Sequence, residues 1–189
     1  MEPRLEQARQ GERTVFFIDA AHFVLGGFLA TLWSLTRQWV KAPSGRQRFN
    51  VLAALNAITH EVHMFTNTGY INAECVCTLL RDIAALGIQN AITVVMDNAR
   101  YQRCHLVQDL AKELGIDILF LPSYSPNLNL IERLWKFVRK QCLYGQYYAD
   151  FATFSTAIET CIRTASCKHR EELKTLLALN FQTFEKCNL

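Results

Sequence analysis

The sequence predicts an α/β domain in which a mixed β-sheet is flanked by helices. Two apolar runs, 14–18 and 92–96, are typical of strands buried on both faces of a helix-covered sheet. Each run leads into an aspartate, Asp19 or Asp97. Around these strands, segments with apolar residues at helical spacing alternate with short apolar runs, and this alternation favours an α/β architecture.

Size and composition narrow the class of protein. A chain of 189 residues, 50% of them hydrophobic, can bury one sizeable core, which excludes a disordered protein. No apolar run approaches the ~20 residues of a membrane helix, and the charged start lacks the apolar segment of a signal peptide. We therefore expect a cytoplasmic protein with no membrane partner. The net charge of +3 permits nucleic-acid binding without demanding it, and the seven scattered cysteines include no Cys-x-x-Cys pair.

In the first half of the chain, the pattern predicts a polar helical leader or linker and three strands. Residues 20–48 receive no assignment, although 28–35 fits either a strand or a helix and 42–45 is a turn signal. The short link between the second and third strands favours an antiparallel hairpin. The leader and the three strands are expected at 1–12, 13–19, 49–58 and 61–66.

In the second half, helices and strands alternate. Asn72 is a suitable N-cap for a helix that Gly87 ends, and Gly115 closes the next helix. The expected elements are a helix from 72, a strand over 91–96, a helix over 102–114, a strand over 116–121, and helices over 127–142, 151–167 and 169–184. An antiparallel meander followed by parallel strands with right-handed crossovers resembles the ribonuclease H-like fold.

The acidic residues each have an ordinary explanation when taken alone. Asp19 and Asp97 could cap turns after their strands, and Glu132 precedes Lys136 at the spacing of a helical ion pair. However, Glu132 has Trp135 at helical spacing, so it borders the buried side of its helix, where an unpaired charge is costly. Three carboxylates from different elements suit a hard divalent cation such as Mg²⁺.

The segment from Leu121 to Trp135 is the most distinctive motif. Its two prolines restrict the loop, and Ser125 or Asn127 could cap the following helix, so the backbone fixes where Glu132 points. The motif is similar to the signature of transposases of the mariner superfamily, most closely its bacterial insertion-sequence branch, which also has thirty-four residues between the second Asp and the Glu. Three further segments match that family: Phe17-Ile-Asp-Ala-Ala-His-Phe, Arg48-Phe-Asn-Val-Leu-Ala-Ala-Leu and Val95-Met-Asp-Asn-Ala-Arg.

The resemblance implies a ribonuclease H-like DDE catalytic domain of the integrase and transposase kind over residues 13–145. A leader or linker at 1–12 and a helical extension packed on the core at 146–189 would flank it. Asp19, Asp97 and Glu132 fall on the catalytic and metal-ligating positions of the family.

The resemblance also implies the chemistry. Two Mg²⁺ ions, which Mn²⁺ could replace, would be held with Asp19 bridging both, Asp97 holding one and Glu132 the other. Water would cleave a DNA strand at a transposon end, and the freed 3′-hydroxyl would attack target DNA.

Two positions depart from the family pattern, and one module is missing. Ala20 stands where many relatives have an acidic residue, and Gln102 stands where many have a histidine. Whole transposases of the family carry N-terminal helix-turn-helix modules, for which this chain has no room, so it resembles a catalytic half from a split or truncated copy. The expected partners are transposon-end and target DNA, a second copy in a homodimer, and an upstream helix-turn-helix polypeptide.

Several polar residues are candidates for contact with DNA. Asn98 could orient a ligand or a phosphate beside Asp97, or it could only form the turn. Basic residues beyond Glu132 and before the second strand could bind phosphates, with solvated surface as the alternative. These residues are Lys136, Arg139, Lys140, Arg46 and Arg48.

Other notable residues are expected to be structural. Trp135 is interpreted as a core residue rather than a platform for base stacking, and His22 is given a local role although it follows Asp19 closely. The loop residues Tyr124, Ser125 and Asn129 are expected to shape the loop. His60-Glu-Val-His63 lacks one residue of the zincin spacing and falls in a hairpin, which disfavours a zinc protease.

Two functions compete with that of a transposase catalytic domain. The first is a ribonuclease H-like nuclease that cleaves without joining strands. The second is a non-catalytic protein that only dimerises with the full enzyme or inhibits it. The complete set of three acids disfavours the second function, whereas the missing end-reading module favours it.

Overall fold

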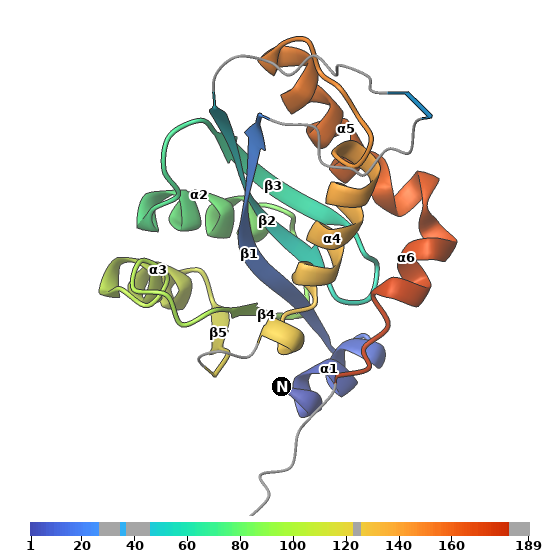
Figure 1. Ribbon diagram of the computed structural model, residues 1–189. Helices are drawn as coiled ribbons and strands as arrows, with labels where there is room; N and C mark the ends of the chain where they lie inside the picture. The colour runs from blue at the N-terminus through green and yellow to red at the C-terminus, as the bar shows by residue number, and fades with distance from the viewer. Residues whose placement is uncertain (27–34, 37–45, 123–125, 182–189) are drawn as a thin grey trace, which may run out of the picture.

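The computed structural model describes residues 1–26, 35–36, 46–122 and 126–181. The apolar run and the turn signal expected between the first two strands lie almost wholly outside these residues. In the described part of the chain, five strands form one mixed sheet in the order β3-β2-β1-β4-β5. Helices cover both faces of this sheet (Figure 1), so the predicted fold class is confirmed.

The central strand is β1 (Arg13–Leu25), which extends well beyond its predicted end at Asp19. It pairs in parallel with β4 (Ala91–Met96) over its first half, and antiparallel with β2 (Gln47–Asn56) from Phe16 to its end. The prediction stopped too early because it relied on a continuous apolar run. Past Asp19, buried and exposed residues alternate along the strand, which is the pattern of a strand buried on one face only.

The strands β3 (Val62–Asn67) and β5 (Ile116–Phe120) form the two edges of the sheet. β2 and β3 are antiparallel and joined by a tight turn, in which His60 has a left-handed φ of 60°. β4 and β5 are parallel. The predicted meander followed by parallel strands is therefore confirmed, and β2 to β5 begin and end within two residues of their predicted bounds.

Two helices, α2 (Ala73–Ala84) and α3 (His105–Glu113), cover the face that carries the even-numbered buried residues of β1. Asn72 caps α2 as predicted, because its side-chain oxygen accepts a backbone N–H of the first turn. α3 is shorter than the predicted helix over 102–114, because a hydrogen-bonded turn at Ala99 precedes it.

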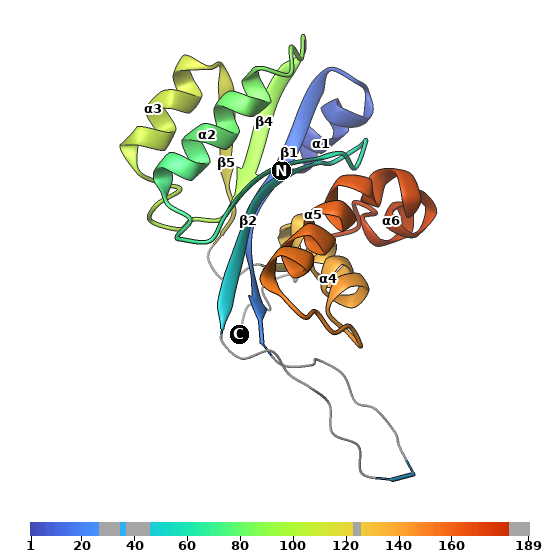
Figure 2. The same cartoon turned by 90° about the horizontal axis from the view of Figure 1, so that it is seen from above.

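Three helices cover the opposite face, namely α4 (Ile131–Cys142), α5 (Phe151–Lys168) and α6 (Arg170–Leu176). The view from above shows these helices and the α2–α3 pair on opposite sides of the sheet (Figure 2). α6 ends earlier than the predicted helix over 169–184, and the described residues beyond it are not helical. No helix in the described ranges is long and apolar enough to cross a membrane.

The start of α4 differs from the prediction in a way that matters for Glu132. The sequence predicted a helix over 127–142 with a side-chain cap, but a short 3₁₀ helix (Pro126–Leu128) comes first. α4 then begins at Ile131, and its N-cap residue, Leu130, offers no side-chain hydrogen bond. Glu132 is therefore in the first turn of α4, where the partial positive charge of the helix N-terminus favours a carboxylate.

The helix α1 (Glu2–Arg9) is part of the core rather than a detached leader. Its residues Leu5 and Ala8 are buried in the same apolar cluster as α4 and the odd-numbered residues of β1. A polar helix with two buried side chains thus closes one end of the sheet.

We expect Leu5→Ala to lower the free energy of unfolding by ~2–4 kcal/mol, because the fully buried side chain would leave a cavity. Urea unfolding followed by circular dichroism measures this change. Glu2→Ala on the exposed side of α1 is the control and should change the free energy by less than ~0.5 kcal/mol. An equally small effect of Leu5→Ala would contradict the assignment of α1 to the core.

Candidate active site

The two aspartates emerge side by side from neighbouring strands. β1 and β4 are parallel with Ile18 opposite Met96, so the next residues, Asp19 and Asp97, lie at the same level of the sheet. Within β1, Asp19 shares its face with Phe23, which packs against α4. The strand pairing therefore delivers both carboxylates to the edge of the layer that carries Glu132.

The three acids are close enough to influence one another electrostatically. The pKa of Asp19 is raised to about 7, mainly by burial, and the negative charges of Glu132 and Asp97 contribute to this rise. Hydrogen bonds from the backbone N–H of Ala20 and from the indole of Trp135 act in the opposite direction. Three acids separated by up to 113 positions in the sequence thus share one electrostatic environment.

Trp135 combines a core position with a contact to Asp19. The side chain is 1% exposed, and its ring packs edge-on against Phe23 at 6.2 Å between centroids. Its Nε1–H donates a hydrogen bond to Asp19 Oδ2 over 3.0 Å. The predicted core position is confirmed, whereas the hydrogen bond to the acid was not predicted from the sequence.

Asn129 is a second residue whose contact the sequence analysis missed. Its side chain is 1% exposed, and its Nδ2–H donates to Asp97 Oδ1 over 3.4 Å. Its Oδ1 is buried and has no hydrogen-bond partner among the described residues. One signal was available in the sequence: Asn129, Glu132 and Trp135 follow one another at intervals of three residues, which would bring them to one side of the helix predicted over 127–142.

Tyr101 lies close enough to two of the acids to be affected by their charges, and Gln102 is bonded to it. Burial raises the pKa of Tyr101 to about 12, and the charges of Asp19 and Asp97 contribute to this rise. Gln102 is buried, its amide donates to the Tyr101 hydroxyl over 3.4 Å, and its Oε1 has no partner among the described residues. Gln102, which stands where many relatives have a histidine, therefore lies beside Tyr101, whose pKa is affected by two of the three acids.

The chemistry of the site fits a hard divalent cation, although the carboxylates do not form a preassembled cage. In the part of the chain that the structure describes, no group of three His, Cys, Asp or Glu residues is close enough to hold an ion. Repulsion between like charges opposes such an approach, and it contributes to the raised pKa of Asp19. Carboxylate oxygens are the ligands that Mg²⁺ and Mn²⁺ prefer, and a bound cation would relieve this repulsion. The role of the three acids as metal ligands stays a prediction.

The candidate DNA contacts occupy two regions. Asn98 is exposed beside Asp97, and Lys136 is exposed on α4. Arg139 lies over the Phe23 ring at 5.9 Å from its centroid, and Lys140 forms an ion pair with the Glu172 side chain at 3.7 Å. Thus three of the predicted basic residues follow Glu132 along one helix.

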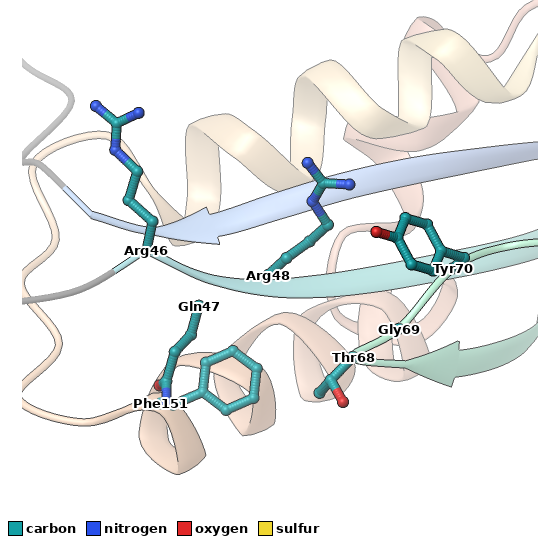
Figure 3. Close-up of a pocket in the computed structure, with 7 residues that line it drawn as sticks. All are labelled: Arg46, Gln47, Arg48, Thr68, Gly69, Tyr70 and Phe151. Carbon is teal, nitrogen blue, oxygen red and sulfur yellow. The ribbon is translucent and has the colours of Figure 1, made fainter.

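Arg46 and Arg48 lie in the second region, at the start of β2. Both are exposed and line a cavity of about 680 Å³ together with Tyr70, which is 83% exposed, and Phe151 (Figure 3). Gln47, between the two arginines, lies on the Phe151 side of β2. The alternation of side chains along β2 therefore puts both arginines on the face opposite Gln47.

Two further residues, His22 and Arg133, make contacts away from the three acids. His22 lies on the even-numbered face of β1, opposite to Asp19, and its Nδ1 hydrogen-bonds Asn50 Oδ1 at 2.7 Å, in agreement with the predicted local role. Arg133 donates to the backbone carbonyls of Leu176, Ala178 and Asn180 and thereby ties the end of the described chain to α4. Tyr124 and Ser125 lie outside the described residues.

Comparison with known families identifies the family of the chain. The model of the family described as DDE superfamily endonuclease matches residues 14–155, which include all three acids. The chain belongs to this family. The resemblance to transposases of the insertion-sequence and mariner type that the sequence predicted is confirmed.

A curated relative is the insertion element IS630 uncharacterized 39 kDa protein of Shigella sonnei. The two sequences are 27% identical over 128 residues, which cover 66% of this chain and 37% of the relative. The chain thus spans little more than a third of the length of that protein.

Solved structures of transposases and integrases share the fold. The Mos1 transposase in a paired-end complex with the left transposon end has a TM-score of 0.62 at 12% identity, over 97% of this chain and 60% of that one. The Mos1 transposase catalytic domain with Raltegravir and Mn gives 0.61 at 14% identity, over 97% and 92%. The catalytic core domain of BIV integrase gives 0.54 at 15% identity, over 82% and 84%. At these identities the likeness establishes the fold alone.

Asp19 should make the stability of the metal-free protein depend on pH. Its folded pKa is raised from 3.8 to about 7, so ionisation does not oppose folding below pH ~4 and opposes it fully above the folded pKa. We expect Asp19→Asn to be more stable than the wild type at pH 8 by up to ~4 kcal/mol, and the difference should vanish near pH 4.

Thermal unfolding in EDTA between pH 4 and pH 8 measures this difference. Asp109→Asn, at an exposed position of α3, is the matched control and should not show the same dependence. A constant difference between Asp19→Asn and the wild type over this range would contradict the buried, charge-coupled environment of Asp19.

Proposed function

We propose that this chain is the catalytic domain of a DNA transposase, which cleaves DNA strands in the presence of divalent metal ions and transfers the new ends into target DNA. The observation that carries the proposal is the convergence of Asp19, Asp97 and Glu132 in a chain of the DDE superfamily endonuclease family. The fold shared with the Mos1 transposase supports it.

The three acids would divide the work of binding two divalent cations. Asp19, on the central strand, would contact both ions, while Asp97 and Glu132 would each contact one. When bound, such ions neutralise charge on the attacking and leaving oxygens of a phosphodiester during an in-line displacement. Mg²⁺ is the expected ion, with Mn²⁺ as a substitute, and the structures of the Mos1 transposase catalytic domain and Raltegravir with Mn or with Mg support this choice.

The protein environment would prepare these carboxylates for the reaction. Burial of Asp19 excludes water from one side of the site, which strengthens electrostatic interactions there. The 3′-hydroxyl left by hydrolysis at the first strand would then be the nucleophile at target DNA, and the same three acids would serve both steps. No covalent intermediate on the protein is needed.

The basic residues would bind the phosphates of the DNA around the cleavage point. Lys136, Arg139 and Lys140 run along α4 away from Glu132, as one side of a path for the backbone. Arg46 and Arg48 would bind phosphates at the cavity near Tyr70, and Asn98 would orient a phosphate beside Asp97. A homodimer and a helix-turn-helix polypeptide that reads the transposon ends are the proposed protein partners.

A nuclease that does not join strands is a second candidate, because the family description names an endonuclease. An assay with pre-cut transposon ends separates the two functions. Joined products would support the transposase, whereas hydrolysis without joining would support the nuclease. If the chain with a helix-turn-helix partner gives neither product, it acts only as a binding protein.

Asp97→Asn should abolish Mg²⁺-dependent nicking, because the substitution removes a negative ligand while preserving the shape of the side chain. Nicking of supercoiled DNA in Mg²⁺ measures the activity, and circular dichroism verifies the fold. Asp109→Asn, an exposed aspartate on α3, should remain active. Nicking by Asp97→Asn at the rate of the control would refute the assignment of the acids.

Arg48→Ala should weaken the binding of DNA, because it removes one phosphate contact. The slope of log K against log salt concentration is negative, and we expect it to become less steep by about one unit. Fluorescence anisotropy with a labelled duplex at several salt concentrations gives the slope. Arg81→Ala, which removes an exposed arginine on α2, should leave it unchanged. Equal slopes for Arg48→Ala and the wild type would exclude Arg48 from the DNA interface.

A further inference from the structure

The residues on either side of Glu132 contact the other two acids. Asn129 lies three positions before Glu132, and its amide donates to Asp97. Trp135 lies three positions after it, and its indole donates to Asp19. One short segment at the start of α4 thus carries one carboxylate and hydrogen-bonds the other two.

We propose that Asn129 and Trp135 are positioning residues, which each fix one oxygen of the Asp97 or Asp19 carboxylate and so limit its orientation for the binding of a divalent cation. The inference rests on the proposed function, because it takes the three acids to be the metal ligands. It gives residues 129–135 a second task besides presenting Glu132, since the segment sets where all three acids stand relative to one another.

The chemical nature of the two donors suits a cation site. A lysine or arginine partner would orient a carboxylate but would also neutralise it and compete with the cation. An indole or amide N–H fixes one carboxylate oxygen and leaves the negative charge in place. In the described ranges, none of the ion pairs involves any of the three acids. No basic side chain of these ion pairs therefore neutralises the negative charge of the three acids, which can attract a cation.

The surroundings of Trp135 restrict the direction of its hydrogen bond. The ring is 1% exposed and packed edge-on against Phe23, so the indole loses little further freedom when it binds Asp19. The donor and its acceptor lie on α4 and β1, respectively, and their contact spans 116 positions of the chain. This hydrogen bond therefore links the helix to the central strand at the level of the acids.

Asn129 has a feature that packing alone does not explain. Its amide is buried, yet its Oδ1 has no partner among the described residues, and an unpaired buried polar atom opposes folding. An apolar side chain of similar size would avoid that penalty. The contact to Asp97 is the interaction that accounts for an amide at this position.

The test measures binding of Mn²⁺ to the full chain without DNA, by electron paramagnetic resonance of the free ion. Trp135→Phe keeps most of the ring volume and removes the N–H, and Asn129→Leu keeps the approximate size and removes the amide. We expect each variant to bind Mn²⁺ about 10-fold more weakly, as is typical when a residue that orients a metal ligand is lost. We also expect both variants to nick DNA more slowly than the wild type at low Mn²⁺ concentration and to regain this activity at higher Mn²⁺ concentration.

The control is Phe137→Leu, a substitution of a buried residue on α4 that disturbs packing without a hydrogen bond to the acids. It should lower thermal stability and leave Mn²⁺ affinity unchanged. Wild-type affinity in both Trp135→Phe and Asn129→Leu would overturn the positioning role, as would an equal loss in Phe137→Leu.

Asp97→Asn separates this inference from the proposed function. If it binds Mn²⁺ like the wild type, the three acids are not the metal site and both proposals fall; if it loses Mn²⁺ while the two variants do not, only the positioning role falls.

Discussion

The parallel pairing of β1 with β4 is the constraint on which the site depends. It is the contact that puts Asp19 and Asp97 at one level of the sheet, and it requires the chain between them to cross back over a face of the sheet. α2 makes part of that crossing and buries its apolar side against the same strands. The two aspartates are thus brought together by the backbone pairing at the centre of the fold, and not by any attraction of their own.

Electrostatics works against this arrangement. Burial raises the pKa of Asp19, and repulsion from the other two carboxylates adds to this rise. The apolar clusters on both faces of the sheet supply the stability that holds the acids in place. A ligand of positive charge would relieve this repulsion, so the site favours cations. Shifted pKa values of this kind are common at functional sites.

Most of the sheet could be predicted from the sequence, because buried strands are recognisable as continuous apolar runs. β4 was predicted to the residue, and the cap at Asn72 was predicted from its residue type. The second half of β1 was missed, since its alternating residues also occur in loops and helices. The onset of α4 was placed too early, because Pro126 signals a turn but does not reveal the 3₁₀ helix that follows.

The contacts at the site were harder to predict than the acids themselves. Asp19, Asp97 and Glu132 stood out by their places at strand ends and in a distinctive motif. The hydrogen bonds of Trp135 and Asn129 join segments that only the folded chain brings together. The spacing of three residues around Glu132 indicates that Asn129 and Trp135 lie near it, but not which side chains of the strands they contact.

The length of β1 has a mechanical consequence. β4 stops at Met96, whereas β2 keeps its pairing with β3 as far as Asn50. The sheet is therefore reduced to two paired strands only where Phe23–Leu25 of β1 face Gln47–Phe49 of β2. A two-stranded ribbon twists more readily than a wider sheet. A change of twist in this short ribbon would move Arg48, which lies on it, and would leave Asp19 in place, because the sheet at Asp19 is wider.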